Sequence, residues 1–262
     1  MTPAPHFLRS VLSTAYFPPV EYFYAIAHSD RVCIEQHENY QKQSWRSRCR
    51  ILSAGGPEDL SVPIVKEERR GRPIRDIRID YGEPWLQQHV RAFSAAYNAS
   101  AFYDYYADDL IPILEKKPVF LFDLNQALLE KLLSLLGLTT PVVLTDSYEK
   151  KLVAPSAEHG DLLSQRGQNL FGVAGSLPRK NLDHSTRHAQ EIAAFDGRER
   201  IQPKYKGESL LAEYGCEQAY YQVFVNQKPS QAGHGAQGFI PNLSILDLLS
   251  AEGPDAGRFL RI

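Results

Sequence analysis

The stretch FLRSVLSTAYFPPVEYFYAIAHSDRVCIE, residues 7–35, decides the fold class. Its first seven residues can form a strand, and the Pro18-Pro19 pair ends that strand before a helix over residues 20–28. Proline is tolerated in the first helical turn because the N–H groups there have no intrahelical partner. Residues 31–35 then form a short second strand. The order strand, helix, strand predicts a parallel crossover and therefore an α/β protein.

The chain around this unit predicts a hairpin, a helical layer and a loop-rich end. Two strands, at 45–52 and 60–65, flank a turn at 53–57. We expect helices at 85–97, 102–116, 119–138 and 242–252, and strands at 141–145 (buried) and 219–225. Residues 149–215 lack a clear period and read as a loop-rich insertion or variable segment. The prediction is one domain, residues 1–262: a central mixed, partly parallel sheet, an antiparallel hairpin, helices, and a loop-rich C-terminal third.

The composition of the chain argues against several classes of function. The chain has 262 residues, with 29 Lys+Arg against 31 Asp+Glu, a net charge of −2. This balance argues against a nucleic-acid binder, which carries a basic excess. Charged residues interrupt the apolar stretch 119–138, so we expect no membrane span, and the start of the chain does not read as a signal peptide. Three cysteines without metal-type spacing fit reduced thiols, which predicts a cytoplasmic protein.

Basic residues gather in the segment 39–51. If residues 45–51 form a strand, Arg46, Arg48 and Arg50 project from one face. Guanidinium groups suit the forked recognition of phosphate or carboxylate, which predicts an anionic ligand such as a nucleotide sugar. The alternative is a solvated strand face paired to Asp or Glu across the sheet.

Aromatic residues and one carboxylate lie near this basic segment. The rings of Tyr16, Tyr22, Tyr40 and Trp45 suit a sugar or a base. Glu21 lies in the first turn of the expected helix 20–28, where it either acts as a catalytic carboxylate or only favours the helix dipole.

Two further groups have plain alternatives. His184, His188 and Glu191 have the spacing of zinc ligands on one helical face, but scattered surface histidines are the commoner outcome, so we expect no metal site. Cys49, between two arginines, is either a nucleophile or a small buried hydrophobe, and the strand pattern favours burial. No residue pattern identifies a cofactor.

Several of these segments, in the same order, resemble the WbqC-like family of bacteria. The resemblance rests on the opening 15–23, the central motif 40–51, the strand 60–65 and the late motif 241–249. It implies a role in O-antigen or other surface-polysaccharide synthesis, with aminoacyl transfer to an amino sugar, and a nucleotidylyltransferase-like fold. The positions that match the family are Tyr16, Pro18, Lys42, Ser44, Trp45, Arg48, Arg50, Ser244 and Asp247.

The opening departs from the family pattern. Leu12 and Ser13 stand where the family shows His-Gln, Thr14 stands in place of Pro, and Glu21 in place of Gly. The resemblance therefore does not extend to a loop that cradles phosphate. Of the matched residues, Lys42 and Ser44 join Glu21 as candidate catalytic groups. Ser244 and Asp247 are candidates for substrate binding, although their three-residue spacing also fits ordinary helix capping.

Two functions follow as hypotheses. The first is an enzyme that transfers an acyl or aminoacyl group to a nucleotide-linked or glycan amino sugar. The second is a non-catalytic binding or assembly protein of a surface-polysaccharide pathway, since no nucleophile–base pair, phosphate loop or metal cluster stands out and Tyr-rich surfaces form interfaces.

Overall fold

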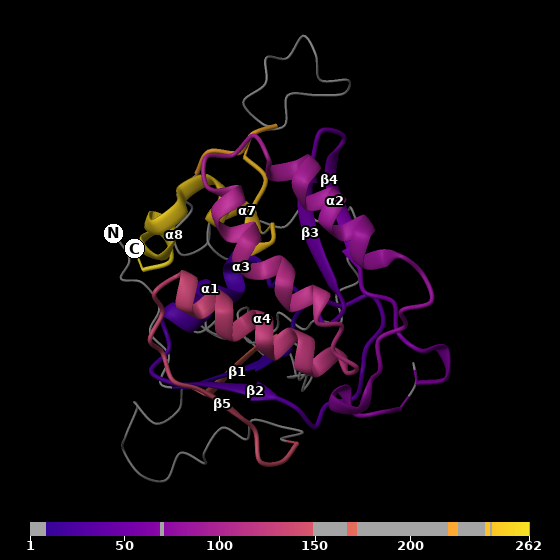
Figure 1. Cartoon of the computed structure of the whole chain (residues 1–262). Helices are drawn as coiled ribbons and strands as arrows, with labels where there is room; N and C mark the ends of the chain where they lie inside the picture. The colour runs from indigo at the N-terminus through magenta and orange to yellow at the C-terminus, as the bar shows by residue number, and fades with distance from the viewer. Residues whose placement is uncertain are drawn as a thin grey trace, which may run out of the picture.

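A parallel sheet and a separate hairpin organise the computed structural model (Figure 1). The structure describes residues 9–68, 71–148, 167–171, 220–224, 239–241 and 243–261. Its main sheet has the order β5-β2-β1-β6, and every neighbouring pair runs parallel. The four strands are β1 (Arg9–Ser13), β2 (Val32–Glu35), β5 (Val142–Leu144) and β6 (Gly167–Phe171).

The expected strand–helix–strand unit is confirmed. Helix α1 (Val20–Ala27) follows Pro19, whose extended backbone marks the boundary, and it connects β1 to its parallel neighbour β2. The helix ends where the His28 N–H bonds back to the carbonyl oxygens of Tyr24 and Ile26. The helix boundary expected from Pro18-Pro19 and the observed parallel pairing of β1 with β2 therefore agree.

The strand order reverses direction beside β1. The chain moves outward from β1 to β2 and on to β5, and then returns to place β6 on the opposite side of β1. Counting these parallel strands alone, the order is 3-2-1-4, which matches the first four strands of the doubly wound order 3-2-1-4-5-6. The α/β prediction is confirmed, with a topological switch point between β1 and β6.

The antiparallel hairpin is a sheet of its own. It pairs β3 (Arg48–Ser53) with β4 (Gly56–Ser61), and the turn between them is shorter than the expected 53–57. Pro57 lies within β4, opposite Leu52, because proline is tolerated on the edge of a sheet. The expected central mixed sheet is thus a parallel sheet with the hairpin beside it.

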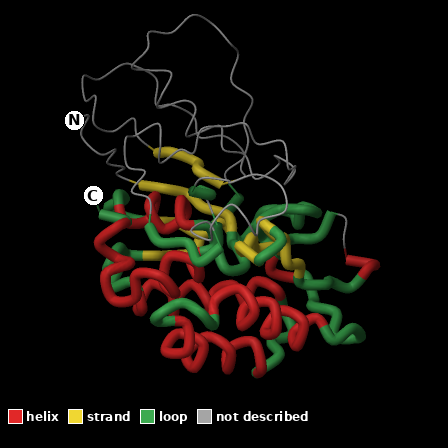
Figure 2. Tube along the Cα trace, turned by 90° about the horizontal axis from the view of Figure 1, so that it is seen from above, coloured by secondary structure: helices red, strands yellow, loops and turns green. Residues whose placement is uncertain are grey.

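Helices gather on one side of the strands (Figure 2). The predicted helices 85–97, 102–116 and 119–138 are confirmed with small differences at their ends, and the late helix begins at residue 245. The helices are α2 (Trp85–Tyr97), α3 (Tyr103–Glu115), α4 (Leu121–Leu135), α7 (Ile245–Glu252) and α8 (Ala256–Phe259), with short 3-10 turns at Lys66–Glu68, Ile74–Asp76 and Gly253–Asp255. None of these helices has the length and apolar character needed to cross a bilayer.

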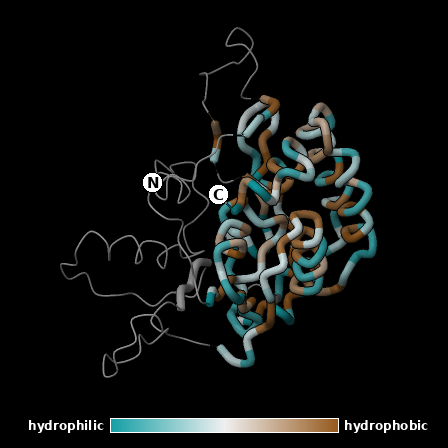
Figure 3. The backbone as a smooth tube through the Cα atoms, turned by 90° about the vertical axis from the view of Figure 1, so that its left-hand side faces the viewer, coloured by the Kyte–Doolittle hydropathy of each residue, from teal (hydrophilic) through white to brown (hydrophobic). Residues whose placement is uncertain are grey.

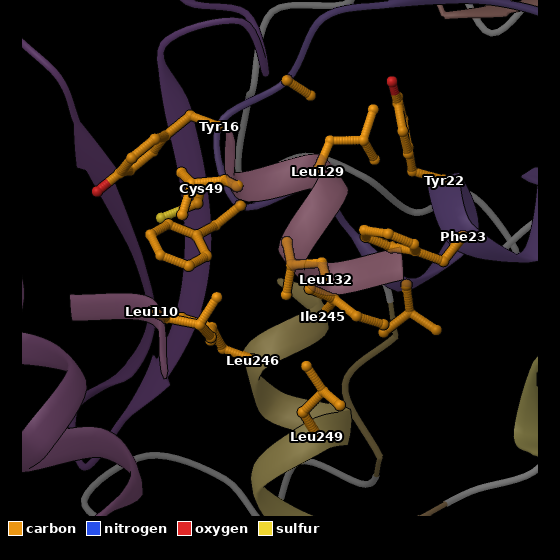
Figure 4. Packing of buried hydrophobic residues seen from close by; sticks show 14 of the residues in the cluster. Tyr16, Tyr22, Phe23, Cys49, Leu110, Leu129, Leu132, Ile245, Leu246 and Leu249 are labelled. Carbon is orange, nitrogen blue, oxygen red and sulfur yellow. The ribbon is translucent and has the colours of Figure 1, made fainter. Parts of the chain in front are cut away.

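One apolar core joins the hairpin, the sheet and the helices. Apolar and polar positions alternate along the tube in Figure 3, as expected for helices and strands with one buried face. Figure 4 shows side chains from distant parts of the chain meeting there, including Tyr16, Cys49, Leu132 and Ile245. Segments separated by some two hundred residues therefore share a single core.

Three expectations differ from the structure. Residues 220–224 are not a strand; Tyr220 instead packs its ring edge-on against Phe239 and Phe259. Strand β5 is only half-buried, with Leu144 44% exposed, because it pairs with β2 alone among the described strands. Within 149–215 the structure describes β6, which sequence periodicity did not predict; the rest of that segment lies outside the described residues.

Candidate functional site

The carboxyl ends of β1 and β2 lie side by side. Their last residues, Ser13 and Glu35, are register partners, so both side chains leave the same face of the sheet. Ligands of open parallel sheets bind outside the carboxyl ends of strands at a switch point, and β1 borders such a point here. This edge is therefore the candidate site.

A buried ion pair occupies the edge. Arg46 Nε donates to Glu38 Oε1 at 2.8 Å, and Arg46 Nη2 donates both to Glu38 Oε2 and to Ser13 Oγ, the latter at 2.9 Å. Ser13 Oγ in turn donates to Glu38 Oε2 at 3.1 Å. Burial raises the pKa of Glu38, Arg46 and Ser13 counteract this, and the nearby Glu35 carboxylate adds to the rise.

Glu35 shares the edge but has fewer partners. Its Oε1 accepts hydrogen bonds from the His37 backbone N–H at 2.6 Å and from Thr145 Oγ1 at 3.0 Å. Its Oε2 is buried, and no described residue donates a hydrogen bond to it. Two carboxylates and one guanidinium therefore meet at this edge, and the Nε and Nη2 atoms of Arg46 donate to Glu38 and Ser13.

The loop between β2 and β3 holds this arrangement in place. The Tyr16 N–H donates to the Trp45 carbonyl at 2.8 Å, and Asn125 Nδ2 of α4 donates to the Arg46 carbonyl at 2.8 Å. The Tyr22 hydroxyl of α1 donates to the Ser13 carbonyl at 2.9 Å. The opening and central motifs, which are well apart in the sequence, are thus in direct contact.

The three arginines do not share one face. Strand β3 begins only at Arg48, so Arg46 does not lie on a strand face. Its side chain is buried. Arg50 forms a forked pair with Asp59 on β4, at 2.7 and 3.1 Å, which is the cross-strand pairing expected in the alternative interpretation. Arg48 is half-buried opposite Ser61 and forms no ion pair with the described residues. Arg48 is therefore the arginine of the three whose charge remains available to an anion.

The three candidate catalytic residues lie in different settings. Lys42 is exposed on the loop before β3, whereas Ser44 is buried and donates to the Gln41 carbonyl at 2.7 Å. Glu21 is buried in the first turn of α1. Their catalytic roles stay predictions.

The aromatic residues divide by burial. Tyr16 and Tyr22 are fully buried, so protein atoms surround their rings, while Tyr40 and Trp45 are half-buried. The Arg50 guanidinium lies 5.9 Å from the Trp45 ring centre. Tyr40 and Trp45 are therefore the two candidates with partly accessible rings.

Tyr16 is fixed by a histidine. Its hydroxyl and His89 Nδ1 are 2.9 Å apart, and burial lowers the pKa of His89 to about 4, although a hydrogen bond to the Ser61 backbone counteracts this. This hydrogen bond joins the chain after β1 to α2 inside the core.

Ser244 and Asp247 lie at the start of α7. Ser244 Oγ caps the helix by accepting from the Leu246 N–H at 3.4 Å, and the Ser244 N–H donates to the Arg50 carbonyl at 2.7 Å. Asp247 is buried and accepts a hydrogen bond from Gln222 Nε2 at 3.2 Å. The capping alternative is confirmed for Ser244.

Two other groups do not enter the site. Cys49 is fully buried, and burial raises the pKa of its thiol well above the ordinary value, so the thiolate needed for nucleophilic attack is disfavoured. His184, His188 and Glu191 lie outside the described residues. Within the described part, no group of three His, Cys, Asp or Glu side chains is placed to bind a metal ion.

Sequence reasoning did not identify Glu35, Glu38 or Ser13 as site residues. Glu35 ends an otherwise apolar strand, and a charged residue at the carboxyl end of a buried parallel strand was the available signal. Glu38 gave no such signal, because no sequence pattern shows that the loop between β2 and β3 brings it into contact with Arg46.

The comparisons with known proteins show the family of the chain. The model of the WbqC-like protein family matches residues 14–259. The chain belongs to this family. It is also 30% identical over 256 residues to a Mycobacterium tuberculosis protein named "Uncharacterized protein Rv1507c", a match that covers 96% of this chain and 98% of the relative. No solved structure matches the chain.

Proposed function

We propose that this WbqC-like protein is an enzyme that transfers an acyl or aminoacyl group to a nucleotide-linked or glycan amino sugar in surface-polysaccharide synthesis. The observation that carries the proposal is the set of charged side chains at the carboxyl edge of β1 and β2, beside the switch point of a parallel sheet. This is where such folds bind nucleotides and their derivatives.

The charges of this region support an anionic substrate. Arg46 and Arg50 are neutralised by Glu38 and Asp59, which leaves the half-buried Arg48 and the exposed Lys42 for an incoming anion. Arg48 lies on β3 two residues after Arg46, and Lys42 lies on the loop that crosses the edge. The half-buried rings of Tyr40 and Trp45, in the same loop as Lys42, are the surfaces on which a sugar or base would stack.

Thermal unfolding with a panel of nucleotides, UDP sugars and amino acids tests the proposal. A ligand that binds only the folded state at a hundredfold excess over its Kd adds about 2.7 kcal/mol of stability. We expect a rise in Tm with a UDP sugar that disappears in the Lys42→Ala/Arg48→Ala variant and persists in Arg75→Ala, whose side chain is exposed. A rise that survives the double substitution contradicts this binding site.

Transfer is measured separately. With an aminoacyl adenylate or an acyl thioester as donor, the sugar amine forms an amide with the donor carbonyl while AMP or the thiol leaves, and mass spectrometry detects the acylated sugar. No amide product, despite Arg48-dependent binding, would leave a binding protein rather than a transferase.

The assembly function is favoured by one observation. Tyr105 on α3 is 68% exposed, and large exposed aromatics are enriched in protein interfaces. If Tyr105→Ser changes the oligomeric state measured by light scattering, while no UDP sugar shifts the Tm, the assembly function replaces the enzymatic one.

A further inference from the structure

Glu35 is a fully buried carboxylate with one unused oxygen. Oε1 is held by the His37 N–H and by Thr145 Oγ1, and Oε2 receives no hydrogen bond from any described residue. Burying a carboxylate without full hydrogen bonding is costly, because the group loses its hydration and gains nothing in return. Glu35 Oε2 therefore lacks a hydrogen-bond donor among the described residues, and a bound ligand would supply one.

The charge balance around Glu35 is negative. Arg46 directs both its bonding nitrogens to Glu38 and Ser13, and no described residue forms an ion pair with Glu35. Burial raises the pKa of Glu38, and the nearby Glu35 carboxylate adds to this rise. A bound group that supplies a positive charge as well as a donor would satisfy both deficits.

Glu35 lies where the ligand-binding residues of parallel sheets are found. It is the register partner of Ser13 on the neighbouring strand, and it ends β2 at the edge where parallel sheets bind ligands. The same edge contains the Glu38–Arg46 pair, which belongs to the loop that follows β2.

We propose that Glu35 binds a primary ammonium group of the substrate and thereby selects amine-bearing substrates over their N-acylated forms. This inference rests on the proposed function and names the substrate group that the site recognises. An ammonium supplies both a hydrogen-bond donor and a compensating charge. A hydroxyl would supply only the donor, and a metal ion would need more ligands than the described residues bring together.

Burial restricts the size of the group. Glu35 has no exposed surface in the ligand-free chain, so the residues that cover it must separate for a ligand to enter. A compact ammonium requires the least separation, whereas a guanidinium or a quaternary amine requires more. The site is therefore expected to discriminate against bulky cations.

Calorimetric titration with UDP-glucosamine and UDP-N-acetylglucosamine tests the inference, because the two differ only in whether the amine is free. We expect the protein to bind UDP-glucosamine at least tenfold more tightly. Glu35→Gln should abolish this preference by weakening UDP-glucosamine alone, and Glu83→Gln, at an exposed position, should retain it. Glu35→Asp keeps the charge and should retain a reduced preference, which guards against misreading a folding defect.

The outcomes separate this inference from the proposed function. If both UDP sugars bind equally and Glu35→Gln changes neither, Glu35 is not the ammonium site, although the proposed function stands. If neither UDP sugar binds, the proposed function fails, and NMR titration with glycinamide then decides the role of Glu35. Glycinamide shifts that are identical in the original protein and Glu35→Gln overturn it; shifts lost in Glu35→Gln support it.

Discussion

Asp247 is a carboxylic acid that the protein surrounds with other polar groups inside its core. Burial raises its pKa to about 6, although Tyr220, Gln222 and Tyr97 counteract the rise. Gln222 connects this acid to the chain around Ile240, because its side-chain amide both donates to the Ile240 carbonyl and accepts from the Ile240 N–H. Gln222 thus links the segments 220–224 and 239–241 to Asp247 of α7.

This pKa predicts how stability depends on pH. The unfolded chain binds the Asp247 proton with a pKa of about 3.9, below the folded value of about 6, so the folded state binds the proton more tightly. The resulting stabilisation is complete below pH 4 and is lost as the pH rises through 6. Asp247→Asn has no charge to bury, and we expect it to be more stable than the original protein by about 3 kcal/mol at pH 7.5.

Urea unfolding at pH 4 and pH 7.5 measures this difference. The advantage of Asp247→Asn should shrink toward pH 4, where both side chains are neutral, and the exposed Asp255→Asn serves as the matched control. Equal stability of Asp247→Asn and the original protein at pH 7.5 would show that burial does not disfavour the charge.

At the scale of elements, α8 packs against the end of α4 through a glycine. A Cβ added to Gly257 would lie 2.2 Å from the Leu136 carbonyl oxygen, a backbone atom that cannot rotate away. We expect Gly257→Ala to lower the free energy of unfolding by about 1–3 kcal/mol, as overpacking does in protein cores. Chemical denaturation measures the loss.

Gly55 in the hairpin turn is the control for that substitution. Its added Cβ would meet only Ser53 Oγ, at an ordinary 3.8 Å, so Gly55→Ala should stay within about 0.5 kcal/mol of the original protein. If both alanine variants lose the same stability, the close approach of α8 to α4 is not the cause.

The elements also show what sequence patterns can predict. The boundaries of α2 agree with the prediction because its apolar face repeats through Trp85, His89, Phe93 and Tyr97, all of which are buried. The apolar run at 219–225 misled the prediction, since Tyr220 packs against Phe239 and Phe259 rather than pairing in a sheet. Periodicity reports that a face is buried, but it does not identify the partner.

The same limit applies to the candidate site. The cross-strand pairing of Arg50 was foreseeable from an alternating strand, whereas the Arg46–Glu38–Ser13 cluster depends on a loop conformation that no period encodes. Residues brought together by a loop between elements become visible only in the folded chain.

At the scale of the whole molecule, Arg46 joins three parts of the fold. Its side chain bonds Ser13 at the end of β1 and Glu38 after β2, and its carbonyl accepts from Asn125 on α4. Removing the guanidinium leaves Glu38 buried without its partner. We expect Arg46→Ala to cost about 3–5 kcal/mol of folding free energy, the usual effect of breaking a buried ion pair.

Arg50 offers the comparison within the same chain. Its pair with Asp59 is partly exposed, and Arg50→Ala should cost less than about 1 kcal/mol. Replacing both members of the buried pair, as in Arg46→Met with Glu38→Gln, should cost less than Arg46→Ala alone, because no uncompensated charge remains. Urea unfolding ranks the stabilities of these variants. A double variant that is less stable than Arg46→Ala would contradict the view that an uncompensated buried charge causes the loss.

The contact between the start of α1 and the segment before α7 has a consequence for how the chain is made. The Val20 N–H bonds the Leu243 carbonyl, and the Ile245 N–H bonds the Pro18 carbonyl. At a synthesis rate of about 5–20 residues per second, these partners leave the ribosome some ten seconds or more apart. Throughout that interval the nascent α1 region lacks its cover of Ile245 and Leu249, and a ribosome stalled before residue 243 would hold an incomplete core within reach of chaperones.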